Sequence, residues 1–150
     1  MSYFVFGLID GTQGSGGATA RVNATAERME LKLGDGRRQP VLDEMLGTYS
    51  PTKSAPFLLT KTREEDTSDS LVSPYVVGVD GSSEAFAAIG RWLVATLRSP
   101  DIERVRVWMT EGYDSVFDRL EVPADRFADE VVTRVRAARD VPSLQVTVVK

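Results

Sequence analysis

The glycine-rich stretch at residues 11–17 is the first part of the chain whose spacing suggests chemistry. Gly11, Gly14, Gly16 and Gly17 give the pattern G-x-x-G-x-G-G behind an apolar run. Backbone N–H groups of such a loop bind phosphate when a lysine or a closer glycine spacing accompanies them at a helix N-terminus. No lysine lies beside these glycines, and they do not form G-x-G-x-x-G. The pattern therefore favours a turn or surface loop over a phosphate site.

Three side chains around the run VRVWM share one face of an expected strand. Arg104, Arg106 and Trp108 alternate with Val105, so they lie opposite its apolar face. Arginines and an aromatic ring on an exposed sheet could bind single-stranded RNA, but the acidic composition and the lack of an RNP-like aromatic pattern oppose this. We expect this face to be buried or to contact another protein.

Acidic residues gather near the sequence EGYD. Glu111, Asp114 and Asp118 could bind Mg²⁺ or act as an acid/base pair, although solvated turn residues explain them more simply. The residues that we predict to bind a partner are Arg104, Arg106, Trp108, Glu111 and Asp114.

A second candidate for ligand binding is YVVGVDGSSEAFAAIGRW at residues 75–92. Its V-G-V-D-G-S turn before an alanine-rich segment resembles the opening strand and helix of universal stress proteins. The resemblance implies that Asp80 lies near a bound adenine nucleotide. It covers about 18 of the 150 residues, and no glycine-rich phosphate motif of that family follows. Helix capping by Asp-Gly-Ser explains the same residues.

The residue types that are missing limit the chemistry further. The chain has no cysteine and no histidine, which excludes disulfides, cysteine-liganded zinc and Ser-His-Asp or Cys-His catalysis within it. A formal charge of -4 opposes binding to nucleic acid or anionic membrane and favours a basic protein partner. The apolar run YFVFGLI is too short to span a membrane and follows no basic region. We therefore expect a cytoplasmic protein without a bound cofactor.

Two helices are expected in the second half of the chain. Apolar residues at steps of three and four predict a helix over residues 82–98, with Ser82 or Ser83 as its N-cap. The same spacing predicts a helix over residues 123–139, with Pro123 in its first turn.

Four strands are expected around these helices. Alternation predicts strands at residues 105–109 and 144–149, and a short apolar run predicts one at 75–79. Residues 115–122 are expected to pair back on 105–109 through EGYD. The order β-α-β-β-α-β then predicts a ferredoxin-like α+β sandwich with Val105, Val107 and Met109 under the helices. Without a strand at 115–122, the alternative is a three-layer α/β arrangement.

The first half is expected to be rich in strands. Residues 18–33 fit either a strand or a helical face, and the alternation of MELKL before Gly-Asp-Gly favours strands. Residues 56–61 form another expected strand, and the polar residues 62–74 form a connector. We predict a single domain over residues 1–150, in which a β-rich part, 1–61, packs on a βαββαβ part, 75–150.

Three functions fit these patterns. The favoured one is a non-enzymatic protein-binding module, such as an acidic inhibitor or immunity-type protein that neutralises a basic partner, with homodimer formation as a further option. The alternative is a nucleotide- or anion-binding domain that uses Asp80 or Gly14, Gly16 and Gly17. A metal-assisted carboxylate enzyme using the acids near EGYD is third.

Overall fold

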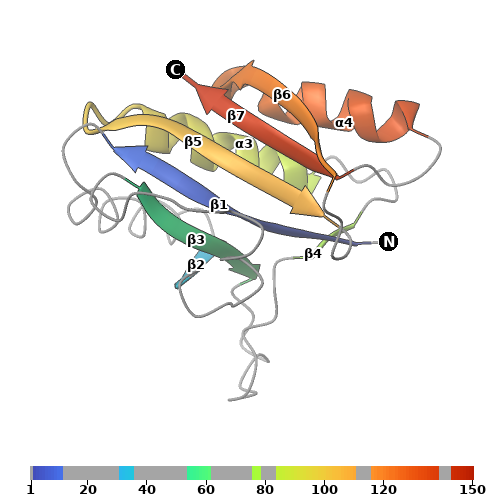
Figure 1. The fold of residues 1–150 in the computed structure, drawn as a ribbon, viewed down its shortest axis with the longest axis horizontal. Helices are drawn as coiled ribbons and strands as arrows, with labels where there is room; N and C mark the ends of the chain where they lie inside the picture. The colour runs from blue at the N-terminus through green and yellow to red at the C-terminus, as the bar shows by residue number, and fades with distance from the viewer. Residues whose placement is uncertain are drawn as a thin grey trace, which may run out of the picture.

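The computed structural model describes residues 2–11, 31–35, 54–61, 76–78, 84–110, 116–138 and 143–150. Within these residues, seven strands form one mixed sheet in the order β2-β3-β1-β5-β7-β6, and β4 also pairs with β1 (Figure 1). The strands are β1 (Ser2–Gly11), β2 (Leu31–Asp35), β3 (Ser54–Lys61), β4 (Val76–Gly78), β5 (Ile102–Thr110), β6 (Asp118–Pro123) and β7 (Leu144–Val149). The helices are α3 (Glu84–Leu97), the 3-10 turn η2 (Ala124–Arg126) and α4 (Phe127–Ala137).

Strand β1 lies at the centre of the sheet and pairs along both of its edges. Along one edge, β1 pairs with β5 in antiparallel register. The other edge is shared: residues 2–4 pair with β4, and residues 6–10 pair with β3. Consecutive side chains of β1 from Val5 to Ile9 are buried. Burial on both faces explains why this strand reads as a continuous apolar run without alternation.

Two helical connections place both helices on the same face of the sheet. Helix α4 joins the parallel neighbours β6 and β7, and α3 joins β4 to β5, which run in the same direction on opposite sides of β1. The connection from β4 to β5 crosses the sheet toward β7, and the connection from β6 to β7 crosses it the opposite way. Because β6 and β7 also run opposite to β4 and β5, two right-handed crossovers put both helices on the same side. Both lie behind the sheet in Figure 1, and α3 packs on α4 and η2. The described part of the molecule therefore has two layers.

The core lies between the helices and the sheet. Phe86, Ile89, Leu93 and Leu97, the predicted apolar face of the first helix, are all buried. Phe127 and Val131 of α4 join them. The strands contribute alternate residues, among them Val5, Ile9, Val105, Val107, Met109, Leu144, Val146 and Val148. The prediction that Val105, Val107 and Met109 lie under the helices is confirmed.

Gly7 of β1 makes room for an aromatic side chain in this core. Phe57 of β3 is the residue directly across from Gly7, and its ring meets Trp92 of α3 edge to face with the ring centroids 5.3 Å apart. A Cβ atom at Gly7 would lie 2.8 Å from the Phe57 ring and would also collide with the carbonyl oxygen of Arg106. The lack of a side chain at residue 7 therefore lets β1 lie beneath Phe57 and close to β5.

The α+β class and the elements of the second half agree with the sequence prediction. The predicted helices correspond to α3 and to η2 with α4, and strand β7 begins and ends at the predicted residues 144–149. The residues of MELKL that the structure describes, 31–33, are in a strand, as alternation favoured.

Two predicted pairings differ from the observed ones. The predicted hairpin between residues 105–109 and 115–122 is not formed, because β7 lies between β5 and β6. A ferredoxin-like sheet would pair these two strands directly, so the β-α-β-β-α-β element order is as predicted but the strand order is different. Strands β1 and β3 of the first half belong to the same sheet as the strands of the second half. The sequence instead predicts that the first half packs on the second. Helix α4 packs on β6 and joins it to its parallel neighbour β7, so β6 pairs with β7 and not with β5.

Other expectations concern residues outside the described ranges. These are the N-caps Ser82 and Ser83 and the connector at residues 62–74. Neither described helix combines the length and the apolar character that crossing a membrane requires.

Candidate functional site

The sheet face turned away from the helices carries side chains from β1, β5, β7 and β6 in register. We call it the helix-free face. Two rows of paired residues cross it: Leu8, Arg106, Thr147 and Glu121 form one, and Phe6, Trp108, Gln145 and Arg119 form the other.

Exposure increases across the helix-free face from β1 to β6. Phe6 and Leu8 of β1 are buried, Gln145 and Thr147 of β7 are partly buried, and Glu121 of β6 is exposed. The accessible part lies on β5, β7 and β6 and is mostly polar, with Val149 and Pro123 as its apolar residues. We call its polar residues the contact strip: Arg104, Arg106, Arg119, Glu121, Gln145 and Thr147.

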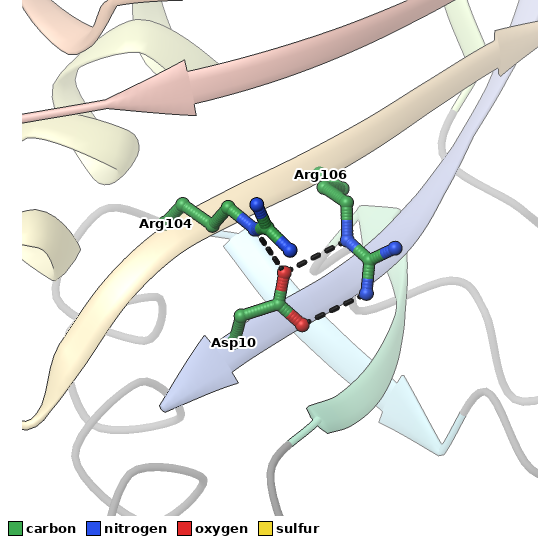
Figure 2. Close-up of polar contacts among 3 residues, drawn as sticks. All are labelled: Asp10, Arg104 and Arg106. Carbon is green, nitrogen blue, oxygen red and sulfur yellow. Dashed lines mark hydrogen bonds and ion pairs between the residues drawn. The ribbon is translucent and has the colours of Figure 1, made fainter. Parts of the chain in front are cut away.

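A buried carboxylate holds two arginines at the margin of the contact strip (Figure 2). Arg104 donates a 2.8 Å hydrogen bond from Nε to Oδ2 of Asp10. Arg106 donates from Nε to the same oxygen at 2.8 Å and from Nη2 to Oδ1 at 2.9 Å. The Asp10 side chain is only 8% exposed, against 45% for Arg104 and 26% for Arg106. The carboxylate thus fixes both guanidinium groups, while the groups themselves reach solvent.

Strand β5 is irregular next to the two arginines. Asp10 pairs with Arg104, but the next residue, Gly11, pairs with Ile102, so Glu103 is an extra residue in β5. Ile102 is buried in the core and Glu103 is exposed. A bulge of this kind bends the strand locally and redirects its side chains. Arg106 reaches Asp10 from the diagonal position, a separation that long side chains can span.

The electrostatics of this cluster favour the charged guanidinium. The pKa of Arg104 is raised above its usual value, first by its hydrogen bond to Asp10. Partial burial opposes the rise, while the negative charges of Asp10, Glu103 and Glu121 add to it. The cluster therefore stabilises the charged form of Arg104.

Trp108 packs within the protein. Its ring stacks on Phe6 with an interplanar angle of 4° and a centroid separation of 6.4 Å. The guanidinium carbon of Arg106 lies 5.9 Å from the Trp108 ring centroid, within the range of a cation–π contact. The indole is 6% exposed. Trp108 therefore packs against the guanidinium group of Arg106. Of the three residues predicted to share this face, only Arg104 and Arg106 are accessible.

Several predicted site residues lie outside the described ranges. They are Gly14, Gly16, Gly17, Asp80, Glu111 and Asp114. Asp118, the remaining acid near EGYD, is the exposed first residue of β6. In the described part of the chain, no three acidic residues are grouped in a way that could hold a metal ion.

Sequence reasoning missed Asp10, the residue that organises the two arginines. It is separated from them by 94 and 96 positions in the chain, so no local spacing connects them. One observation could have drawn attention to it. Asp10 ends the apolar run FGLID, and a carboxylate in a buried strand requires a charged or hydrogen-bonding partner.

This arrangement suits recognition better than bond-breaking chemistry. Its accessible groups are guanidinium, amide, hydroxyl and carboxylate side chains on a regular sheet. Arginine stays protonated and cannot serve as a general base, whereas its planar donors bind carboxylates and other oxyanions well.

No protein-family model matches the chain, and no curated protein and no solved structure is significantly similar to it.

Proposed function

We propose that the protein is a non-enzymatic protein-binding module and that the contact strip is its interface. The observation that carries this proposal is the pair Arg104 and Arg106, held by a buried carboxylate on the accessible part of β5. Arginine is enriched at protein interfaces, and an arginine whose orientation is already fixed loses less side-chain entropy on binding.

The rest of the contact strip supports the same function. Gln145 and Thr147 offer neutral hydrogen-bonding groups between the arginines and the exposed pair Arg119 and Glu121. This mixture of partly buried polar groups and exposed charges fits the polar rim of a protein interface better than a small-molecule pocket.

The net charge of -4 favours a basic partner, as for an inhibitor or immunity-type protein. Within the described ranges, 11 Lys and Arg residues face 10 Asp and Glu residues, so the whole acidic excess lies in the rest of the sequence. The acidic excess would attract the partner at long range, and the contact strip would set the geometry of the complex at short range.

The experiment first identifies a partner by co-purification from the native host and then measures affinity with both purified proteins. Arg104→Ala and Arg106→Ala are the interface variants. Arg134→Ala and Arg136→Ala, on the helix α4 at the other face, remove the same charge as matched controls. We expect each interface variant to weaken the complex at least about tenfold, as for an arginine that carries much of the binding energy, and the controls to change affinity less than about threefold.

The alternative outcome is equally clear. Equal losses for the variants on both faces would mean that only net charge matters and would reject the contact strip as the interface. Failure to obtain any complex that can be rebuilt from purified components would reject the protein-binding function.

One observation favours anion binding as a second candidate. No lysine lies beside the glycines that begin at Gly11. Arg104 and Arg106 are cations that contact Asp10, the residue just before Gly11. A nucleotide- or anion-binding domain using Gly14, Gly16 and Gly17 or Asp80 is the corresponding function. Calorimetry with ATP, NAD and cyclic nucleotides tests it, and the absence of heat at millimolar ligand would reject it.

A further inference from the structure

The two arginines retain donors that the described residues do not use. Arg104 engages only its Nε, so neither of its terminal amino groups has a partner among the described residues. Arg106 engages Nε and Nη2, which leaves its other terminal amino group without a partner in the same ranges. Each guanidinium carries five N–H donors in a fixed plane. The cluster therefore has hydrogen-bonding capacity left over beside solvent.

The charge of the cluster is also incompletely balanced. Two guanidinium groups face one carboxylate, so Asp10, Arg104 and Arg106 together carry one excess positive charge. Asp10 is buried, and its strand β1 is hydrogen-bonded to β5, which carries both arginines. The two guanidinium groups therefore cannot move apart without breaking their hydrogen bonds to Asp10. A second anion would both use the free donors and reduce the repulsion between the two cations.

Neighbouring acids limit the charge of that second anion. Glu103 and Glu121 lie close enough for their charges to raise the pKa of Arg104. One carboxylate neutralises the single excess positive charge of the cluster, whereas a dianion such as phosphate would leave a surplus negative charge beside these two acids. A group with a single negative charge and two oxygens is therefore the best match to the cluster.

We infer that Arg104 and Arg106, held by Asp10, form a subsite for one carboxylate group of the protein partner. The carboxylate belongs to an acidic side chain or to a chain terminus, and its two oxygens accept the terminal N–H donors of the two arginines. This inference rests on the proposed protein-binding function. A partner that is basic overall can still place one carboxylate at the centre of the contact.

A purely structural role for the cluster makes a different prediction. If the arginines only join β1 to the irregular part of β5, a carboxylate compound added to the solution has no site to bind. It should then shift the arginine signals no more than any other salt at the same ionic strength. Acetate can therefore test the subsite on the isolated protein.

The experiment is an NMR titration of the arginine side-chain Nε–Hε signals of the full chain. Sodium acetate is the probe, with sodium chloride and sodium phosphate at equal ionic strength for comparison. We expect saturable shifts of Arg104 and Arg106 with acetate, with a dissociation constant on the order of millimolar, and weaker saturation with phosphate. The exposed Arg134 of α4 is the internal control and should change equally with acetate and chloride.

Two variants complete the test. Arg104→Lys keeps the charge but loses the planar donors and should weaken acetate binding at least about fivefold. Arg104 is 45% exposed, so Arg104→Gln should fold normally and abolish saturation. Shifts with acetate no larger than those with chloride, or tighter binding of phosphate than of acetate, would overturn the inference.

The subsite and the proposed function can fail separately. Saturable acetate binding without any protein complex would reject the function and leave an anion site. A protein complex whose affinity is unchanged by Arg104→Gln would keep the function and reject the subsite.

Discussion

Gly7 provides the sharpest test of how the sheet and the helix layer fit together. In Gly7→Ala, the new methyl group would collide with the backbone carbonyl oxygen of Arg106 and lie 2.8 Å and 2.9 Å from two atoms of the Phe57 ring. The ring can turn only by disturbing its contact with Trp92, and the carbonyl can move only with strand β5. Overpacking in a core typically costs about 1–3 kcal/mol, and the backbone collision places this variant at the upper end, about 3 kcal/mol.

The assay is urea unfolding followed by tryptophan fluorescence, because Trp92 and Trp108 are both buried. At this chain length, about 3 kcal/mol corresponds to a fall in Tm of roughly 6–12 °C. Gly90→Ala is the matched control: its methyl group would lie 3.7 Å from the Ala128 Cβ, an ordinary contact, and should stabilise the protein by about 0.5–1 kcal/mol. A Gly7→Ala protein as stable as the unmodified chain would refute this account of the β1–β5 contact.

Three further substitutions test other parts of the fold. Thr96→Val should raise the free energy of unfolding by about 1 kcal/mol in urea titrations, because the buried hydroxyl of Thr96 has no hydrogen-bond partner in the described residues. Asp10→Asn should lower it by about 2–3 kcal/mol, because the neutral amide cannot balance two arginines; an unchanged midpoint would contradict the importance of the cluster. Arg126→Ala should change Tm by less than about 2 °C, because its ion pair with Glu130 is 3.7 Å long and exposed, worth under about 0.5 kcal/mol; a larger fall would reveal a contact beyond that pair.

The helices and most strands could be predicted because their patterns are local. Helix α3 follows from the spacing of its buried residues, and β7 from the alternation of LQVTV at residues 144–148, whose burial alternates in the same way. The partners of the strands could not be predicted in this way. The sequence EGYD favoured a hairpin between β5 and β6, but β7 lies between them as the parallel neighbour that α4 joins to β6.

The candidate site was predictable only in part for a similar reason. Alternation is enough to place Arg104, Arg106 and Trp108 on one face, and the register confirms this. Their different exposures depend on distant parts of the chain: Trp108 stacks on Phe6 of β1, and both arginines meet Asp10 near the end of that strand. Contacts that span about a hundred residues leave no periodicity in the sequence.

The central position of β1 has a consequence for synthesis of the protein. Residues 2–11 leave the ribosome before all of their partners, which lie in residues 54–58, 76–78 and 102–110. Until β5 has emerged, this apolar run has no complete sheet to join and remains a target for chaperones and for self-association. Its late insertion between strands that are far apart in the chain should limit the rate at which the whole sheet folds.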